Sequence, residues 1–378
     1  MRGNGQPTAE REASTPITPI RIWGWRLTAP GRLEGFEKTA ERPGPNRVLV
    51  EIAGCGVCHT DLGFLFGGVA TKHPLPLVLG HEIAGRVVAA GAGAESWLSR
   101  RVLVPAVAPC GTCRACRDGR ATSCRASVMP GNDADGGFAS HVEVSSRGLC
   151  PVDPGDVRKD SKDPVGTAGL DLWEISVVAD AVTTPLQAIR RSGLSAGDLA
   201  VVIGAGGVGT YAVQIAKRMQ ASVAAVDLDP ARLARARSMG ADVTVRAGSE
   251  LREIRGQLRT WAESLGAKDA VWRIYEMSGS KTGQELAFAL LAPGATVSIV
   301  GYTPEPVPVR LSNLMAFDAT AYGNWGCDPA LYPEALALVA SGDVLVRPLV
   351  KKEALADAPA VLAAVHAGQF TERVVLVP

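Results

Sequence analysis

Four of the eight cysteines lie within fifteen residues of one another. Their order is Cys110, two residues, Cys113, two residues, Cys116, seven residues and Cys124. Thiolates are soft ligands, and four of them at this spacing can surround one tetrahedral ion such as Zn²⁺. Two disulfides are the alternative interpretation, but closely spaced cysteines in a reducing compartment favour metal. The cluster therefore predicts a closed, structural zinc site.

A second group of possible metal ligands is incomplete. Cys58 lies in residues 54–61 (GCGVCHTD) and His81 in residues 80–82 (GHE), which supplies one thiolate and one imidazole. A catalytic zinc site usually has three protein ligands and an open position. By themselves, one cysteine and one histidine are more often buried packing residues than ligands.

A glycine-rich turn follows a short β-branched run. Residues 199–203 (LAVVI) lead into residues 204–209 (GAGGVG), and apolar residues at helical spacing continue to Met219. A second apolar run at residues 222–226 ends in Asp227. Strand, turn, helix and second strand together indicate one βαβ unit with an acid at its end.

The glycines of this turn predict a dinucleotide site. Gly204 permits the tight turn, Gly206 lets the backbone approach a pyrophosphate, and Gly209 lets the helix pack closely on the strand. Asp227 would accept the ribose hydroxyls and repel a 2′-phosphate, so NAD is favoured over NADP. Arg232 can face the adenine, or it can be an ordinary surface charge of a helix.

Length, composition and charge limit the class of protein. The 378 residues correspond to two or three domains of ordinary size. A net charge of +1 provides no field that would attract nucleic acid, an anionic membrane or an acidic partner. Apolar stretches are far shorter than the roughly eighteen residues of a membrane span, and residues 1–19 lack the apolar core of a signal peptide. We therefore expect a globular cytoplasmic protein with a disordered tail at residues 1–19.

The pattern of elements changes along the chain. Strand-like runs separated by Gly and Pro clusters are typical of an irregular β domain. They lie at residues 47–52, 82–89, 101–107 and 138–144. After Pro185, strands alternate with helical patterns, which is typical of a doubly wound parallel sheet. Residues 152–172 indicate a long loop or insertion. The final segment contains a helix at residues 333–340 and strand-like runs at 344–349 and 373–377.

In this order the motifs resemble those of zinc-dependent alcohol dehydrogenases of the medium-chain dehydrogenase/reductase superfamily. The similarity extends over residues 21–377 and rests on GCGVCHTD, GHE, the four-cysteine cluster and GAGGVG. It implies an α/β protein with a GroES-like β catalytic domain and a Rossmann domain built on a doubly wound parallel sheet. The catalytic domain would comprise residues 20–181 and 325–378, and the NAD-binding domain residues 182–324. The active site would lie between them.

The resemblance also implies roles for individual residues. Cys58 and His81 would bind a catalytic zinc ion, while the four-cysteine cluster would bind a second, structural zinc ion. Thr60 would receive the substrate proton, and His59 would lie near the cofactor pyrophosphate. Four further positions would contact the nicotinamide or the phosphates, although any of them can instead be an ordinary loop or core residue. They are Thr184, Val300, Gly301 and Arg373, in addition to the turn residues Gly204, Gly206, Gly207, Val208 and Gly209.

The third zinc ligand departs from the family pattern. Many relatives have a cysteine just before the Rossmann domain, where this chain has Asp180. One thiolate, one carboxylate and a neutral imidazole still neutralise Zn²⁺, and the harder ligand makes it a stronger Lewis acid. Glu82 is the alternative ligand. We favour Asp180, because three protein ligands and an open position are the catalytic norm. Asp61 is expected to orient His81.

Five short segments carry a narrower resemblance. They are residues 129–133 (MPGND), 136–141 (GGFASH), 147–151 (RGLCP), 178–185 (VADAVTTP) and 323–327 (GNWGC). Together they resemble the 6-hydroxycyclohex-1-ene-1-carbonyl-CoA dehydrogenases of anaerobic benzoyl-CoA degradation. The substrate would then be a cyclic allylic secondary alcohol on a CoA thioester, oxidised to the enone with NAD⁺. Arg158, Lys159 and Lys162 can bind the CoA phosphates, although a solvated charged loop is the simpler interpretation.

Other functions remain open. Another zinc alcohol or polyol dehydrogenase would share every motif and differ only in its substrate pocket. A zinc ion beside an enone can also assist the addition of water, which would make the site a hydratase as well. Zinc-free reductases or NADPH-binding proteins share the fold, but the presence of Cys58, His81 and Asp180 argues against them. We expect a homo-oligomer, either a dimer or a tetramer.

Overall fold

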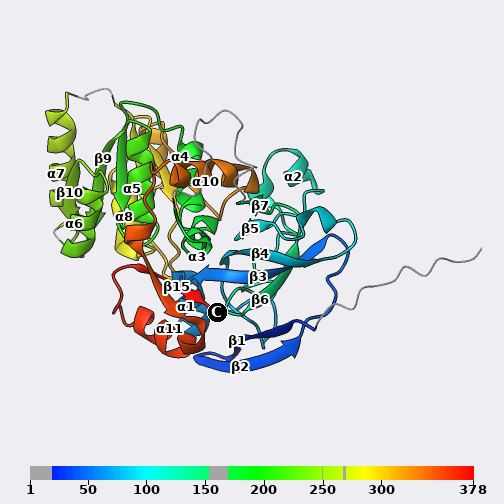
Figure 1. The fold of residues 1–378 in the computed structure, drawn as a ribbon. Coiled ribbons are helices and arrows are strands. Elements are labelled where there is room, and N and C mark those ends of the chain that lie inside the picture. The colour runs from blue at the N-terminus through cyan, green and yellow to red at the C-terminus, as the bar shows by residue number, and fades with distance from the viewer. Residues whose placement is uncertain (1–18, 153–168, 249, 267–269) are drawn as a thin grey trace, which may run out of the picture.

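The structure is a computed structural model that describes residues 19–152, 169–248, 250–266 and 270–378. It contains two large sheets that lie beside each other, with the second half of the chain forming the left-hand body in Figure 1. The expected tail before residue 19 and the charged segment with Arg158, Lys159 and Lys162 lie outside the described residues.

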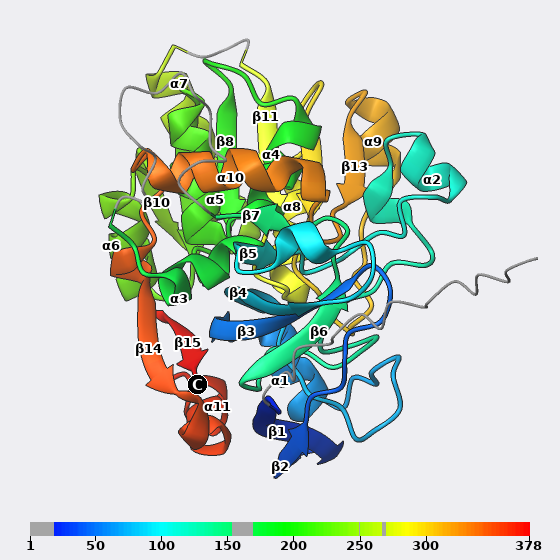
Figure 2. The ribbon, with the colours of Figure 1, turned by 45° about the vertical axis from the view of Figure 1, so that its right-hand side comes forward.

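The first sheet combines strands from both ends of the chain. Its order is β14-β15-β3-β4-β5-β7, and β6 pairs with β3. The N-terminal strands are β3 (Arg47–Gly56), β4 (Glu82–Ala90), β5 (Arg101–Val104), β6 (His141–Ser145) and β7 (Cys150–Pro151). The C-terminal strands are β14 (Val350–Ala354) and β15 (Arg373–Val377). Because β15 is hydrogen-bonded to β3, the end of the chain is placed beside residues 55 and 56 (Figure 2).

Smaller elements surround this sheet. An antiparallel pair, β1 (Arg21–Ala29) and β2 (Arg32–Thr39), lies below it in Figure 1. The helices are α1 (His59–Leu65), α2 (Arg114–Arg117), α3 (Leu172–Ile175) and α11 (Ala358–His366). The core of this part includes Val48, Val50 and Ile52, which alternate along β3 and are buried.

The second sheet has six parallel strands in the order β10-β9-β8-β11-β12-β13. They are β8 (Leu199–Ile203), β9 (Ser222–Asp227), β10 (Val243–Arg246), β11 (Trp272–Glu276), β12 (Thr296–Ile299) and β13 (Thr320–Gly323). The helices are α4 (Thr183–Ser192), α5 (Gly209–Arg218), α6 (Pro230–Ser238), α7 (Leu251–Ser264), α8 (Lys281–Ala289) and α9 (Ser312–Ala316). Counted along the chain, the strand order is 3-2-1-4-5-6, which is that of a dinucleotide-binding sheet.

Strand β8 shows why both faces of the second sheet are covered. All five of its residues are buried. Val202 packs in one cluster with Tyr211 of α5, whereas Val201 packs in another with Leu258 of α7. A strand that is apolar on both faces needs a helical layer on each side, and the helices supply both.

Helix α10 (Tyr332–Ala340) ties the two parts of the molecule together. Its Tyr332 is fully buried. The phenol oxygen of Tyr332 accepts a hydrogen bond from the Ala106 backbone N–H at 2.9 Å and donates one, at 2.5 Å, to the carbonyl oxygen of Ala179. One side chain thereby joins the loop after β5 to the segment before α4.

Most of the predicted elements are present, and one is wrong. The runs at residues 47–52, 82–89, 199–203, 222–226 and 373–377 are strands, and the helix at 333–340 is α10. The strand predicted at residues 344–349 is wrong, because the chain forms a 3₁₀ turn at Arg347–Leu349 and the strand begins at Val350. Pro348 lacks a backbone donor, and Val344, Val346 and Leu349 are buried in a packed loop, with a three-residue step after Val346 that breaks strand alternation.

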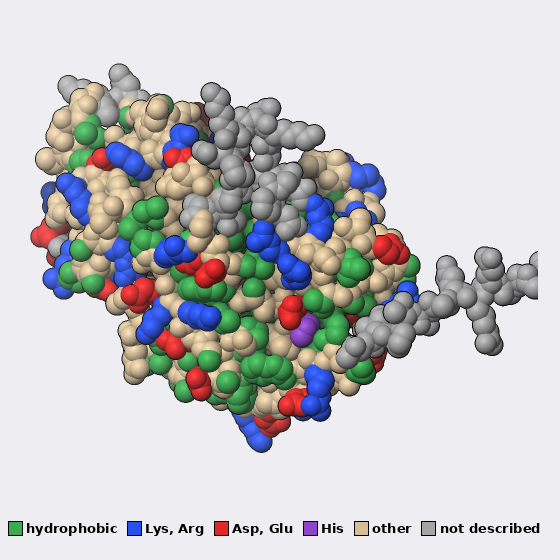
Figure 3. Space-filling view, viewed as in Figure 1, with side chains coloured by type: hydrophobic (Ala, Val, Ile, Leu, Met, Phe, Trp, Pro, Cys, Tyr) green, Lys and Arg blue, Asp and Glu red, His purple; other side chains and the backbone are tan. Residues whose placement is uncertain are grey.

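The surface agrees with the balanced composition. On the face shown in Figure 3, basic and acidic side chains are interspersed rather than separated into single-sign patches. Within the described ranges, every helix is too short or too polar to cross a membrane.

Candidate active site and metal sites

The four-cysteine cluster lies in the lobe around α2. The Cys113 sulfur lies 3.5 Å from that of Cys116 and 3.7 Å from that of Cys124, and the Cys110 and Cys116 sulfurs are 4.0 Å apart. These separations exceed a disulfide bond of about 2.05 Å, and all four are free thiols. Sulfurs at about 2.3 Å from a tetrahedral zinc ion are about 3.8 Å apart. The cluster therefore fits a zinc ion closely.

Backbone donors prepare this cluster for a metal. Hydrogen bonds from the backbone N–H groups of Thr112 and Cys113 lower the pKa of Cys110 to about 5. Desolvation and the neighbouring Cys113 raise the pKa of Cys116 to about 12. A metal bound here must displace the remaining protons, so its affinity is expected to fall in acid.

A second cluster brings together Cys58, His81, Glu82 and Asp180. One possible ligand atom from each lies within 4.8 Å of the others. Cys58 follows β3, His81 and Glu82 stand at the beginning of β4, and Asp180 follows the 3₁₀ turn at Ser176–Ala179, three residues before α4 begins. Antiparallel pairing sets Gly56 opposite Glu82, so the ligand-bearing ends of β3 and β4 meet.

Asp61 orients His81 and ties the ligand segments together. Its Oδ1 accepts hydrogen bonds from His81 Nδ1 and from the Gly80 N–H, each at 3.2 Å. Its Oδ2 accepts the Cys58 N–H at 2.9 Å. Burial disfavours the charged imidazole, but the Asp61 carboxylate and the hydrogen bond with Asp180 hold the pKa of His81 well above its usual value. With Nδ1 engaged, Nε2 is the atom that faces the cluster.

Asp180 presents one carboxylate oxygen to His81 and the other to Thr184. Its Oδ2 lies 3.7 Å from His81 Nε2, and its Oδ1 accepts the Thr184 hydroxyl at 2.5 Å. Burial opposes ionisation, but the hydrogen bonds with His81 and Thr184 lower the pKa of Asp180. Asp180 is therefore an anion with one oxygen directed at the cluster.

Glu82 is held by Arg373 across the sheet. Arg373 Nε donates to Glu82 Oε2 at 2.7 Å, and its second nitrogen donates to Oε1. Both side chains are buried. A Cβ atom at Gly56 would lie 2.1 Å from Glu82 Oε2, so glycine is required beside this carboxylate. Burial raises the pKa of Glu82 to about 7, against the lowering effect of Arg373.

The donor set of the second cluster fits zinc. A thiol, an imidazole nitrogen and a carboxylate oxygen are common zinc ligands. At zinc distances of about 2.0–2.2 Å, a nitrogen and an oxygen ligand are about 3.4 Å apart. The observed 3.7 Å between His81 and Asp180 is close to this value.

The glycine-rich turn between β8 and α5 requires two of its glycines. Gly204 has φ +90°, and a Cβ atom there would lie 2.6 Å from the Ser278 backbone. A Cβ atom at Gly209 would lie 1.8 Å from the Gly204 carbonyl oxygen. Val208 is the residue from which α5 begins. Gly204 and Gly209 therefore have the steric roles that the glycine pattern predicts, a tight turn and close packing of the helix on the strand.

Two arginines flank the other glycines of the turn. Arg232 reaches to 3.7 Å from the Cβ position of Gly206, and Arg373 to 2.7 Å from that of Gly207. Burial and then the charges of Arg373 and Arg232 lower the pKa of His59. Cationic groups beside backbone N–H groups at the beginning of a helix can bind a phosphate.

The remaining predicted residues lie nearby. Asp227 Oδ2 accepts the Ala205 N–H at 2.8 Å, which brings the acid to the glycine turn. Thr60 Oγ1 lies 3.7 Å from the Cys58 sulfur. The N–H groups of Val300 and Gly301 donate to the carbonyl oxygen of Glu276, at 2.9 and 3.1 Å, at the carboxyl edge of the sheet.

Sequence reasoning missed Glu276 itself. This fully buried carboxylate accepts hydrogen bonds from the backbone of Ser278 and Gly279, at 2.8 and 3.1 Å, while its Oε2 has no partner. It holds the loop against which Gly204 packs. A signal existed, because Glu276 ends a buried strand in the same way as Asp227.

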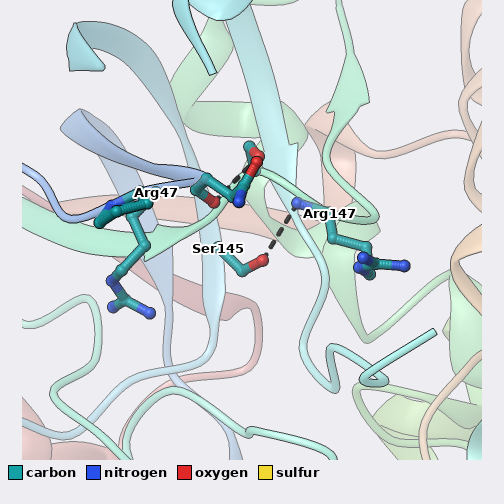
Figure 4. Close-up of a pocket in the computed structure, with 6 residues that line it drawn as sticks. Arg47, Ser145 and Arg147 are labelled. Atoms are coloured by element: carbon teal, nitrogen blue, oxygen red, sulfur yellow. Dashed lines mark hydrogen bonds between the residues drawn. The ribbon is translucent and has the colours of Figure 1, made fainter. Parts of the chain in front are cut away.

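A surface pocket of about 420 Å³ lies away from these clusters (Figure 4). Its lining residues are Pro45, Asn46, Arg47, Ser145, Ser146 and Arg147. Arg47 pairs with Glu143, and the Arg147 N–H donates to Ser145 Oγ at 3.1 Å. Arg47 and Gly56 are the two ends of β3, which places this pocket about 30 Å from the Cys58 end of the strand.

Comparison with known proteins identifies the family. Residues 44–154 match the alcohol dehydrogenase GroES-like domain, and residues 207–341 match the zinc-binding dehydrogenase family. The chain is 29% identical to an alcohol dehydrogenase of Geobacillus stearothermophilus over 343 residues, which cover 90% of this chain and 94% of that protein. It is 31% identical to an alcohol dehydrogenase of Rhizobium meliloti (strain 1021) over 314 residues, covering 82% and 85%.

A solved structure supports the same assignment. Acetophenone reductase from Geotrichum candidum NBRC 4597, in complex with NAD, superposes with a TM-score of 0.78 at 27% identity, covering 96% of this chain and 99% of that one. The chain belongs to the zinc-dependent medium-chain alcohol dehydrogenase superfamily. It is an NAD(P)-dependent oxidoreductase that acts on CH–OH donors. The predicted fold class, a GroES-like domain and a Rossmann domain, is confirmed.

Proposed function

We propose that this enzyme oxidises a secondary alcohol with NAD⁺ at a zinc ion held by Cys58, His81 and Asp180. The observation that carries the proposal is the convergence of these three donors within 4.8 Å of one another, from the ends of β3 and β4 and the segment before α4. The glycine turn and Arg232 belong to the Rossmann part, and Arg373 of β15 reaches Gly207 of the turn from the first sheet.

The contacts of the two carboxylates favour Asp180 over Glu82 as the third ligand. Both oxygens of Glu82 accept hydrogen bonds from Arg373, so ligation by Glu82 would break a buried ion pair. Asp180 keeps Oδ2 free of hydrogen bonds from Thr184 and directs it at His81 Nε2. Cys58, His81 and Asp180 then leave the fourth position to the substrate.

A zinc ion held by these residues would supply Lewis acidity that lowers the pKa of an alcohol, and NAD⁺ would supply the hydride acceptor. The protein supplies the positions and a route for the proton. Thr60, whose Oγ1 lies 3.7 Å from the Cys58 sulfur, would receive the hydroxyl proton of the substrate. Arg373, Arg232 and His59 would bind the pyrophosphate, and Asp227 would accept the ribose hydroxyls.

The acid at the end of β9 supports NAD as the cofactor. Asp227 is buried to 7% exposure and lies against the glycine turn, where a 2′-phosphate would meet a second negative charge. Initial rates with NAD⁺ and NADP⁺ at equal concentrations test this preference directly. Faster turnover with NADP⁺ would contradict it.

The narrower substrate proposal is the cyclic allylic alcohol of 6-hydroxycyclohex-1-ene-1-carbonyl-CoA. Five short segments support it by resemblance, and the alternative is a simple alcohol or polyol, as the names of the relatives suggest. A steady-state screen of the acyl-CoA against simple alcohols separates the two. Turnover of simple alcohols alone would refute the acyl-CoA proposal. A parallel incubation of the enone without free cofactor tests for hydratase activity.

Two further proposals concern metal content and assembly. We propose two zinc ions per chain, one in each cluster, which elemental analysis of the purified protein can count.

We also propose a homo-oligomer that forms through the β13 edge of the second sheet. The chain before and after β13 exposes Leu311, Met315 and Trp325, and such apolar surface is typical of an interface. A monomeric mass in light scattering would contradict this assembly.

A further inference from the structure

We infer that Thr184 is a positioning residue that holds one oxygen of Asp180 so that the other oxygen alone meets the metal. The inference rests on the proposed role of Asp180 as a zinc ligand. It concerns a hydroxyl for which the family resemblance implies a different role, contact with the nicotinamide or the phosphates.

A carboxylate ligand poses a problem that a thiolate does not. A cysteine offers a single sulfur, whereas an aspartate offers two equivalent oxygens and can rotate or bind through both. In this structure Thr184 Oγ1 donates to Asp180 Oδ1 at 2.5 Å, while Oδ2 lies 3.7 Å from His81 Nε2. The hydroxyl therefore distinguishes the two oxygens and leaves one donor atom for the cluster.

Thr184 can do this because its own position is fixed on both sides. Its N–H donates to the Asp180 carbonyl oxygen at 2.9 Å, in the first turn of α4. Its carbonyl oxygen accepts a hydrogen bond from Asn324 Nδ2 at 3.3 Å, from the segment that leaves β13. The residue is only 6% exposed. The hydroxyl therefore has little freedom to leave Asp180.

The neighbouring Thr183 offers a matched control. It is fully buried, and its hydroxyl donates to backbone carbonyl oxygens, that of Ala179 at 3.0 Å and that of Asp180 at 3.5 Å, rather than to the Asp180 carboxylate. Thr183→Val and Thr184→Val remove the same atom group from adjacent positions. Only the second change frees Asp180 Oδ1.

The experiment compares Thr184→Val, Thr184→Ser and Thr183→Val with the unaltered enzyme. The readouts are the zinc dissociation constant from chelator competition, the visible spectrum of the Co²⁺-substituted protein, and the NAD⁺ dissociation constant. We expect Thr184→Val to weaken the catalytic zinc by about 10–100-fold and to change the Co²⁺ spectrum. Thr184→Ser keeps the hydroxyl and should restore both, while Thr183→Val should leave both unchanged.

Three results would overturn the inference. They are unchanged zinc affinity in Thr184→Val, an equal loss in Thr183→Val, or a loss confined to NAD⁺ affinity, which would restore the cofactor-contact role. Asp180→Asn in the same assay separates the two levels of the argument. If Asp180→Asn loses zinc and Thr184→Val does not, the ligand proposal stands and the positioning role fails. If Asp180→Asn keeps its zinc, the ligand proposal itself fails.

Discussion

The buried pair of Arg373 and Glu82 predicts a specific stability defect. Arg373→Met removes a guanidinium whose side chain is 5% exposed and leaves Glu82, at 0%, without its partner. Breaking a buried ion pair by removing one member typically costs about 3–5 kcal/mol, because the remaining group must either stay charged out of water or take up a proton. We expect a loss of this size in the free energy of unfolding. NAD⁺ binding should also weaken, since Arg373 lies at Gly207 of the glycine turn.

A second substitution identifies the cause of this loss. In the double variant Glu82→Gln, Arg373→Met no buried charge remains, so most of the stability should return. Arg190→Met is the matched control, because Arg190 also donates from two nitrogens to a carboxylate, that of Glu334, but both side chains are partly exposed, at 50% and 33%. Its loss should be clearly smaller, since solvent screens an exposed pair.

Urea midpoints measured with saturating zinc provide the comparison, because metal binding contributes to apparent stability. The account predicts strong coupling between the two substitutions. Additive losses in the double variant would refute the reasoning, because they would show that the lost free energy of unfolding does not come from the unpaired Glu82 charge. A loss in Arg190→Met as large as that in Arg373→Met would also refute it, because burial would then not set the cost.

Three further predictions concern cofactor choice, metal content and pH. Asp227→Ala should raise the kcat/KM ratio of NADP⁺ to NAD⁺, because it removes the charge that opposes a 2′-phosphate; an unchanged ratio would contradict this role. Cys113→Ser should lower the metal content by one zinc ion per chain and reduce thermal stability, whereas two retained ions would contradict the structural site. The hydrogen bond from Arg347 lowers the pKa of Glu174 in the folded protein. The ionised Glu174 therefore stabilises the fold above its unfolded pKa of about 4.5. This stabilisation is lost as the pH falls through the lower folded pKa. Unfolding curves of Glu174→Gln and the unaltered chain should therefore differ at pH 7 and converge in acid; a constant gap would contradict this linkage.

Local signals in the sequence predicted the parts of the site that local geometry determines. The turn from Gly204 to Gly209 needs small residues at fixed steps, so spacing alone indicates it. The cysteine cluster is equally local, because its four sulfurs come from fifteen consecutive residues. The second cluster needed the family resemblance, since Cys58 and Asp180 are far apart in the chain and only the fold brings them together.

Contacts between distant segments could not be predicted from the sequence. Glu82 and Arg373 are separated by 291 positions, so their ion pair depends on β15 returning to the first sheet. The strand predicted at residues 344–349 failed for a related reason. Its apolar residues belong to a loop whose side chains pack against the core, and a 3₁₀ turn that contains Pro348 ends the strand-like spacing. The spacing of apolar residues indicates which side chains are buried, but it does not show whether their backbone forms a strand or a loop.

The zinc content of purified Asp180→Asn tests the central claim most directly. The account predicts that this variant keeps the zinc ion of the four-cysteine cluster, loses most of the second ion together with turnover, and binds NAD⁺ nearly as tightly as the unaltered enzyme. Two zinc ions per chain with an unchanged rate would contradict it and transfer the ligand role to Glu82.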